Sequence, residues 1–285
     1  MANIRLIKSR IKSAKSISQI TKAMELVSAS KMRKAQQQAL AGKLYAQKIR
    51  DMVFSLAART DITNHPLLRP PLTDTKKRLV ILVSTTKGLC GGLNITLFRS
   101  LMKEYSFLDN LEFITLGIKG TNFITQMHGV LKADFSDKVP FVDSVPALTQ
   151  MLTDAFLSGS VCGVDIVYNE FLSALKQIPR KKTLLPLTLT GLPDEKIKSG
   201  PEFLIEPSVS EVFEALLPHY LENQVRDAVL QADASEHSAR MVAMRNATDN
   251  ALSFMEELTL VYNKARQEKI TYEISDIVTA RLASE

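Results

Sequence analysis

The chain has 285 residues, 45% of them hydrophobic, which is enough for one or two domains with packed cores. It contains no run of about 18 uncharged apolar residues, so no membrane-spanning helix is expected, and its basic start lacks the apolar core of a secretory signal. The two cysteines and four histidines form no metal-binding or redox spacing, which excludes the common zinc and disulfide scaffolds and fits a reducing compartment.

The net charge of +6 conceals a strong asymmetry along the chain. Residues 1–58 hold 12 Lys and Arg against two acids, whereas residues 211–285 hold 7 basic and 13 acidic residues. The simplest interpretation is that a basic helix and an acidic helix are partners. Nucleic-acid binding by the basic segment is the alternative. It is disfavoured because no aromatic residue precedes Tyr45 and no groove-reading motif is present.

The N-terminal segment is predicted to be one long helix over residues 1–58. Neither glycine nor proline occurs before Gly42, and both are strong helix breakers. Apolar residues recur every three or four positions, close to the 3.5-residue period of a left-handed coiled coil. The predicted stripe consists of Ile4, Ile7, Ile11, Ala14, Ile17, Ile20, Met24 and Val27.

The middle of the chain, residues 76–190, alternates strand and helix patterns. The expected strands are LVILVS (79–84), LEFITLG (111–117), CGVDIVYNEFLS (162–173) and KKTLLPLTL (181–189), the last two joined as a hairpin. The expected helices are an amphipathic stretch from Leu97 to Tyr105 and the segments 119–128 and 145–158. This alternation predicts a small α/β (Rossmann-like) domain with a mostly parallel sheet.

A glycine-rich loop, TTKGLCGGLN (85–94), follows the first expected strand. It lacks the Lys-Ser/Thr of a phosphate-binding loop and does not fit GxGxxG. Gly88, Gly91 and Gly92 are therefore interpreted as parts of a tight strand-to-helix turn. An anion cradle at the start of the next helix is the alternative.

The C-terminal segment, residues 209–285, is predicted to be the second long helix, and Pro218 is expected at a first turn or at a kink. Paired antiparallel with the first helix, it is longer by roughly 20 residues, about 30 Å. A lone helix of that length is unstable in water, so the overhang needs a sleeve from another protein. Its predicted stripe is Val212, Leu216, Leu217, Tyr220, Val225, Ala228, Ala232, Ser235, Ala239, Val242, Leu252, Met255, Leu258, Tyr262, Ala265, Ile274, Ile277, Val278 and Leu282.

Four motifs, in order along the chain, resemble the gamma-subunit family of the rotary F-type ATP synthase. They are ITKAMELVSASKMRKAQ (20–36), TTKGLCGGLN (85–94), SARMVAMRNATDNA (238–251), and LVYNKARQEKIT with YEISDIV (260–278). The resemblance covers the whole length and is loosest over residues 120–205. It implies a long antiparallel coiled coil of the terminal helices with a small central α/β domain.

The resemblance also implies a function, that of a central rotor shaft in a proton-translocating ATP synthase. Such a shaft couples rotation of the membrane c-ring to conformational cycling of the three catalytic beta subunits. The implied partners are three alpha and three beta subunits around one copy of this chain, the epsilon subunit and the c-ring. The implied location is the cytoplasmic face of the bacterial inner membrane. No cofactor, metal or active site of its own is implied, and the inserted redox segment of photosynthetic members is absent.

Contact residues follow from the resemblance by motif. Met24, Arg240, Gln267 and Thr271 resemble the family's contacts with the beta-subunit loops, with Lys22 and Arg266 beside them. Glu206 resembles a residue of the foot near the c-ring. Ordinary structural roles are the alternatives: coiled-coil core for Met24, an ion pair with Glu236 for Arg240, and plain solvation for Gln267 and Thr271.

Three rival functions differ in what they predict. A non-rotary coiled-coil adaptor or scaffold would form a stable homodimer and leaves the four motifs unexplained. A nucleotide-binding enzyme using GLCGGLN would bind ATP or NAD as an isolated chain. A DNA-binding basic helix would bind duplexes with a strong dependence on salt.

Overall fold

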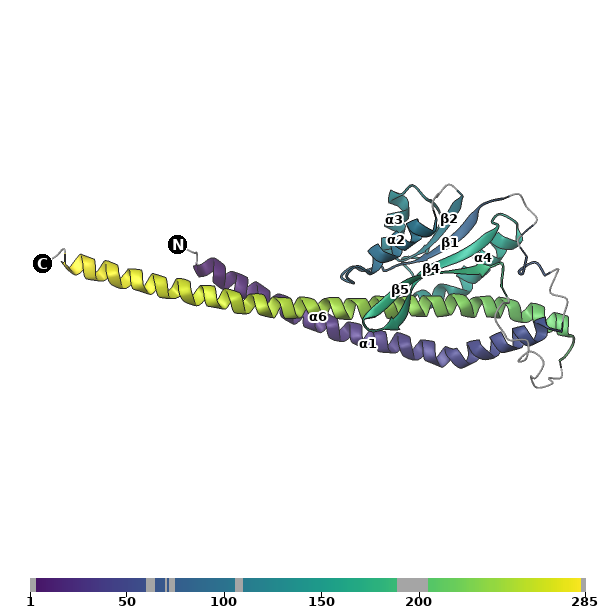
Figure 1. The fold of residues 1–285 in the computed structure, drawn as a ribbon, viewed down its shortest axis with the longest axis horizontal. Coiled ribbons are helices and arrows are strands. Elements are labelled where there is room, and N and C mark those ends of the chain that lie inside the picture. The colour runs from purple at the N-terminus through teal and green to yellow at the C-terminus, as the bar shows by residue number, and fades with distance from the viewer. Residues whose placement is uncertain are drawn as a thin grey trace. The chain divides into compact units, whose positions relative to one another are not determined.

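The computed structural model describes residues 4–59, 65–69, 71, 75–105, 110–188 and 205–282. The elements follow the order α1, β1, α2, β2, α3, β3, η2, α4, β4, β5 and α6 (Figure 1). The chain divides into two compact units. One comprises residues 30–239, and the other combines the described residues up to Ala29 with those from Arg240 onward.

Both predicted terminal helices are present. Helix α1 spans Ile4–Ala57, and α6 spans Val209–Leu282. Each helix contributes one segment to each unit. Pro218 lies inside α6 rather than in its first turn, so it removes one backbone hydrogen bond from the helix interior.

The unit of residues 30–239 contains a five-stranded sheet in the order β3-β2-β1-β4-β5. The first four strands are parallel, and β5 pairs antiparallel with β4 as the predicted hairpin. The strands are β1 (Arg78–Val83), β2 (Leu111–Leu116), β3 (Val130–Asp134), β4 (Gly163–Ser173) and β5 (Lys176–Leu185). Strand β3, a short edge strand of mixed polarity, was not expected from the sequence. Strand β5 begins at Lys176, five residues before the expected start at residue 181, and residue 189 lies outside the described residues.

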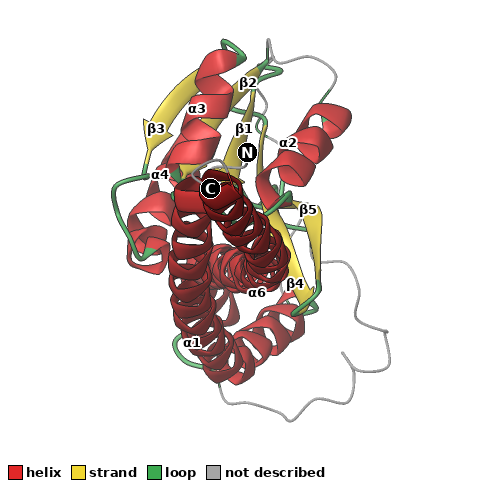
Figure 2. Ribbon diagram, turned by 90° about the vertical axis from the view of Figure 1, so that its left-hand side faces the viewer, coloured by secondary structure: helices red, strands yellow, loops and turns green. Residues whose placement is uncertain are grey.

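Two short helices cover one face of this sheet (Figure 2). They are α2 (Leu93–Glu104) and α3 (Ile118–Gln126). Phe98 of α2 and Phe123 of α3 stack on each other with their ring centroids 4.2 Å apart. The core beneath them is formed by Val80, Leu82, Leu97, Leu101, Leu111, Phe113, Ile124 and Val167.

The opposite face is covered by α4 (Val145–Leu157), the preceding 3₁₀ turn η2 (Phe141–Ser144), and the segments of α1 and α6 in this unit. Val53 of α1, Leu148 of α4 and Leu217 of α6 are fully buried in one cluster with Ile81 of β1. Burying each such side chain stabilises the fold by about 1.5–3 kcal/mol. The segments of α1 and α6 that belong to residues 30–239 are therefore part of the core of the α/β unit.

The second unit is an antiparallel pair formed by the N-terminal part of α1 and the C-terminal part of α6. Ile7 packs with Leu258 and Ala265, and Tyr262 packs against the same cluster. Further along, the hydroxyls of Thr21 and Thr248 are 2.7 Å apart. From the first contact level to the second, the residue number rises along α1, from Ile7 to Thr21, and falls along α6, from Tyr262 to Thr248. The two helices therefore run in opposite directions, as in an antiparallel coiled coil.

The predicted stripe of α1 is wrong beyond Ala14. Ile17, Ile20 and Val27 are 51%, 59% and 55% exposed. Three successive steps of three residues turn the stripe by about 180° around the helix, so Ile20 cannot share a seam with Ile11. The residues that face α6 instead recur at alternating spacings of three and four residues along α1. Its buried and half-buried residues are Ile4, Ile7, Ile11, Ala14, Ser18, Thr21, Glu25 and Ser28.

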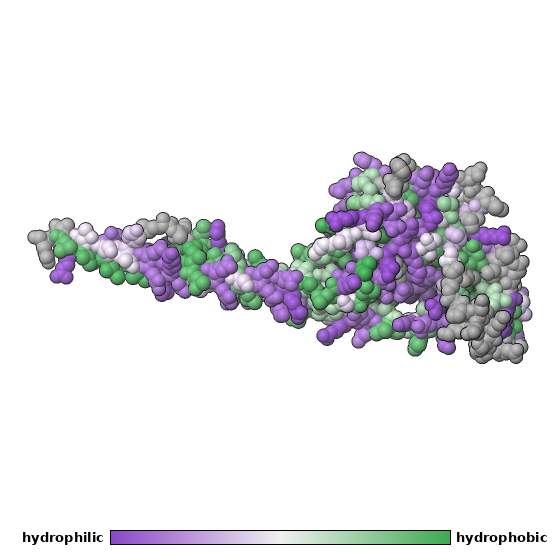
Figure 3. Space-filling model, in the orientation of Figure 1, coloured by the Kyte–Doolittle hydropathy of each residue, from purple (hydrophilic) through white to green (hydrophobic). Residues whose placement is uncertain are grey.

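The C-terminal end of α6 is exposed on every side. All residues from Arg266 to Leu282 are exposed, over about 25 Å of helix. Ile274 and Ile277 are among them, at 56% and 69% exposure. Figure 3 shows hydrophobic side chains on the surface of this unit. This stretch corresponds to the predicted overhang.

Candidate functional site

The middle of the helix-pair seam is polar and charged. Glu25 is only 5% exposed. Its carboxylate lies 3.0 Å from Lys22 Nζ of the same helix and 3.3 Å from Arg245 Nε of α6. A buried carboxylate needs such partners, because an isolated buried charge is strongly disfavoured. Lys22 therefore forms an ion pair with Glu25, although the Lys22 side chain is 55% exposed.

Met24 lies beside the seam rather than in it. It is half-buried, while its neighbour Glu25 occupies the buried position. Leu6, Ile17 and Ile20 lie on the same side of the helix as Met24, at spacings of 18, 7 and 4 residues. We call Leu6, Ile17, Ile20, Met24 and Val27 the apolar outer face of α1. Large apolar groups exposed together are typical of an interaction surface.

Arg240 and Glu206 have contrasting environments. Arg240 of α6 is only 7% exposed, so little of it is accessible to another chain. Glu206 is exposed in the turn just before α6. Their roles as partner contacts stay predictions.

Arg266, Gln267 and Thr271 are all exposed on the overhang. The Thr271 hydroxyl donates to the carbonyl of Gln267 at 3.0 Å, so these two residues share one face. The predicted contact residues lie on three elements. Lys22 and Met24 are on α1, Arg240 and the trio Arg266, Gln267 and Thr271 are at two separate levels of α6, and Glu206 is in the turn before α6 in the other unit. Sequence reasoning missed Glu25, Arg245 and the Thr21–Thr248 pair, although strict seven-residue spacing from Ala14 identifies Thr21.

The glycine-rich loop forms a tight turn at the carboxyl end of β1. Gly91 has φ +59°, and Leu89 also lies in the left-handed region, at +63°. Asn94 Nδ2 donates to Thr85 Oγ1 at 2.7 Å and to Cys90 Sγ at 3.6 Å, which closes the turn. A cavity lined by described residues lies next to this turn, at the end of β1. Its volume is only ≈10 Å³, far too small for a nucleotide.

The other end of the sheet holds a buried charge cluster. Asp165 of β4 accepts from Arg78 at 2.8 and 2.9 Å, from Tyr105 at 2.6 Å and from Thr183 at 2.8 Å. Burial alone would raise the pKa of Asp165, but these hydrogen bonds outweigh it and hold that pKa below its usual value. Burial and the bond to Asp165 raise the pKa of Tyr105. Every member bonds another, so the cluster ties β1, β4 and β5 together.

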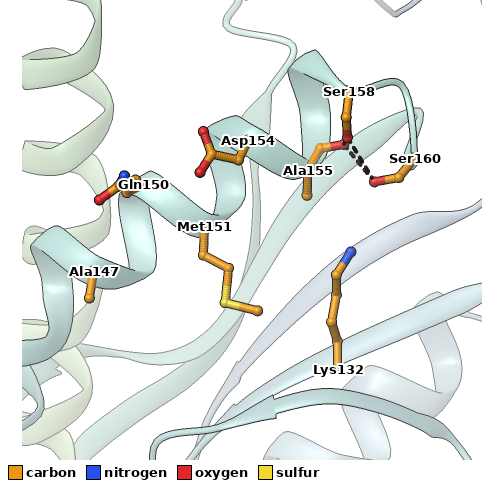
Figure 4. Close-up of a pocket in the computed structure, with 8 residues that line it drawn as sticks. All are labelled: Lys132, Ala147, Gln150, Met151, Asp154, Ala155, Ser158 and Ser160. Carbon is orange, nitrogen blue, oxygen red and sulfur yellow. Dashed lines mark hydrogen bonds between the residues drawn. The ribbon is translucent and has the colours of Figure 1, made fainter.

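A shallow hollow of ≈550 Å³ lies between β3 and α4 (Figure 4). Lys132 and Met151 point into it, whereas Asp154 points away. Lys132 is already paired with Glu112 at 3.1 Å, and the hydroxyls of Ser158 and Ser160 bond to the carbonyl of Ala155. The hollow has no nucleophile paired with a base. The described part of the chain also contains no cluster of three potential metal ligands and no helix apolar enough to cross a membrane.

Fold and surface together define a class: a coiled-coil protein with an attached α/β unit, whose exposed apolar helix surfaces are suited to binding other chains. Comparison with known proteins specifies the family. A family model described as ATP synthase matches residues 3–283. The ATP synthase gamma chain of Dehalococcoides mccartyi is 42% identical over 98% of each chain, and that of Opitutus terrae is 41% identical over 100% of this chain and 99% of its own.

Solved structures agree on the fold. The rotor of the Euglena gracilis mitochondrial ATP synthase matches with a TM-score of 0.66 and 20% identity, covering 94% of this chain and 98% of that one. The central stalk of the Tetrahymena thermophila mitochondrial ATP synthase matches with a TM-score of 0.57 and 22% identity, over 80% and 99%. The chain belongs to the ATP synthase family, in the group whose curated members are named gamma chains.

Proposed function

We propose that this chain is the central rotor shaft of a proton-translocating ATP synthase. It couples rotation of a membrane c-ring to conformational cycling of three catalytic beta subunits. The observation that carries this proposal is the surface of the helix-pair unit. Its buried seam is rich in small polar residues, while Ile17, Ile20 and Val27 stay outside and the stretch Arg266–Leu282 has no covering helix among the described residues.

The apolar outer face of α1 and the overhang would be covered by a ring of three alpha and three beta subunits around one copy of the chain. The 12 basic residues of segment 1–58 give α1 a positive surface that would face acidic loops of that ring. Within the ring, Met24, Lys22, Arg240, Arg266, Gln267 and Thr271 are the proposed contacts. Glu206 is proposed to lie at the foot, near the c-ring and the epsilon subunit.

The mechanism follows from differential contact. An asymmetric shaft in a three-fold ring touches each beta subunit differently and so stabilises a different conformation in each. Shifting a subunit from 1:99 to 99:1 needs about 5.5 kcal/mol of differential binding energy. Fully burying one isoleucine contributes about 1.5–3 kcal/mol, and half of that is available for a half-exposed one. On the order of five such side chains therefore suffice.

The chain would work as a peripheral subunit on the cytoplasmic face of a bacterial inner membrane, reaching the membrane only through the c-ring. Nucleotide sites would lie on the surrounding subunits. The shaft's own contribution would be shape and contact energy.

Reconstitution tests the proposal. The purified chain is mixed with alpha and beta subunits from the same source, and native mass and ATP hydrolysis are measured. A complex with three alpha, three beta and one copy of this chain, active where the chain alone is inactive, is the expected result. A chain that stays out of the complex and forms a stable homodimer supports the scaffold alternative instead. Nucleotide binding or hydrolysis by the chain alone also refutes the shaft.

A matched pair of variants tests the proposed surface. Ile20→Lys changes the apolar outer face, whereas Lys15→Ala changes an exposed residue of the same helix outside that face. We expect only Ile20→Lys to weaken assembly, without lowering the helix content of the isolated chain. Equal assembly by both variants would remove the outer face from the proposed interface.

A further inference from the structure

The carboxyl end of β1 lies beside the middle of β4, at a switch point of the sheet. From β1 the chain proceeds to β2 on one side, whereas β4 pairs with β1 on the other side. In open α/β sheets, ligands bind in the crevice outside the strand ends at such a point. Here α6 closes the crevice, because Ala232, Asp233 and Glu236 line it from the helix side.

Side chains of α6 fasten the helix to β4 and the turn that follows it. Gln231, Ser235 and Ser238 follow one another at spacings of four and three, so they lie on one face of α6. Gln231 Oε1 accepts from Phe171 N at 3.3 Å, Ser235 Oγ donates to Asn169 O at 2.9 Å, and Ser238 Oγ donates to Ala174 O at 2.7 Å. We call this set of contacts the β4–α6 joint.

A cavity of ≈10 Å³ remains beside the joint. That volume is about what one water-sized species needs. Asn169 lines the cavity and is only 3% exposed. Its side-chain oxygen Oδ1 has no hydrogen-bond partner among the described residues, although its backbone oxygen is bound by Ser235. A buried amide oxygen without a donor is unfavourable, so the site is suited to a bound donor.

The charge of the lining selects the kind of species. Asp233 and Glu236 bring carboxylates to the cavity, and Asp233 also lies 3.3 Å from His237 Nε2. Carboxylates and an amide oxygen repel phosphate and attract a proton donor or a cation.

We propose that the cavity binds one small species, either a water molecule that donates hydrogen bonds to the oxygen atoms or a monovalent cation that these atoms coordinate. The bound species bridges Asn169 Oδ1 of β4 to a carboxylate of α6 and completes the β4–α6 joint. The crevice that holds a ligand in other doubly wound sheets is thereby used to attach a helix. This inference goes beyond the proposed function and does not depend on it.

The test uses thermal unfolding of the full chain with Asn169→Leu, which keeps the side-chain volume and removes the polar atoms. Loss of the bridge is expected to lower Tm by about 2–4 °C. Asn223→Leu is the control, because Asn223 lies on α6 and its side chain donates an exposed hydrogen bond to the carbonyl of His219. The control should leave Tm unchanged. An Asn169→Leu variant that melts at the same temperature as the unsubstituted chain, or higher, overturns the proposal.

Two further measurements separate the sources of the bound species. Tm is compared in potassium, sodium and choline chloride at one ionic strength. A dependence on the cation that disappears in Asn169→Leu identifies a cation. Equal Tm in all three salts, with a density peak within hydrogen-bond distance of Asn169 Oδ1 in an experimental map, identifies water. A high-resolution map with no peak at Oδ1 overturns the proposal in either form. None of these readouts needs partner subunits or ATP turnover.

Discussion

Replacing Asp165 by Asn tests whether the buried charge cluster around Asp165 stabilises the fold. Asp165 is completely buried, and its carboxylate faces Arg78, whose side chain is 34% exposed. Breaking a buried ion pair by removing one partner costs about 3–5 kcal/mol. Water reaches part of Arg78, so the lower end applies, and we expect a loss of about 3 kcal/mol in the free energy of unfolding. At about 2–4 °C per kcal/mol, Tm should fall by about 6–12 °C.

The assay is urea and thermal unfolding of the full chain, followed by circular dichroism. Glu170→Gln is the matched control, because its ion pair with Arg180 at 2.7 Å lies on the surface of the same hairpin. Exposed pairs contribute little, so the control should unfold at the same midpoint as the unsubstituted chain. A loss below about 1 kcal/mol for Asp165→Asn would refute the reasoning that the charge, rather than the shape, of Asp165 matters.

The remaining predictions concern pH, the seam and the overhang. The lowered pKa of Asp165 means that its contribution to stability is complete above its unfolded pKa and is lost as pH falls through the folded pKa, so Asp165→Asn should flatten the acid limb of a stability–pH curve. Thr21→Val or Thr248→Val should each cost about 1 kcal/mol, and the double variant should cost less than their sum, as a double-mutant cycle on the 2.7 Å contact will measure. Ile274→Ala on the exposed overhang should reduce ATP synthesis less than Ala239→Glu, where a bulky charge enters a half-buried position; equal losses would contradict this ranking.

Much of the fold follows from strong local patterns. The run Leu79–Val83 is wholly apolar and lies wholly buried in β1, as a strand of a parallel sheet covered on both faces requires. The two ends of the chain, which are poor in glycine and proline, form α1 and α6, and these helices continue through Gly42 and Pro218. By contrast, β3 carries Lys132 and Asp134 within five residues, and its position at the sheet edge depends on pairing with β2 rather than on local pattern.

The candidate site was harder to predict than the fold. Hydrophobicity favours Ile17 and Ile20 as seam residues, whereas the coiled-coil period requires Ser18 and Thr21 there. Hydrophobicity and period disagree because α1 has two distinct faces at this level: a polar face packed against α6 and an apolar face exposed on the outside. Single-sequence periodicity cannot distinguish an apolar residue buried within the chain from one exposed for a partner.

The apolar outer face of α1 has a consequence for the life of the protein before assembly. Ile17, Ile20 and Val27 are more than half exposed on the free chain, and Ile277 is 69% exposed on the overhang. Such surfaces promote aggregation in a protein without its partners. A newly made copy is therefore most vulnerable between synthesis and incorporation. We expect cells to match the supply of this chain to that of the proposed ring subunits and to degrade any surplus.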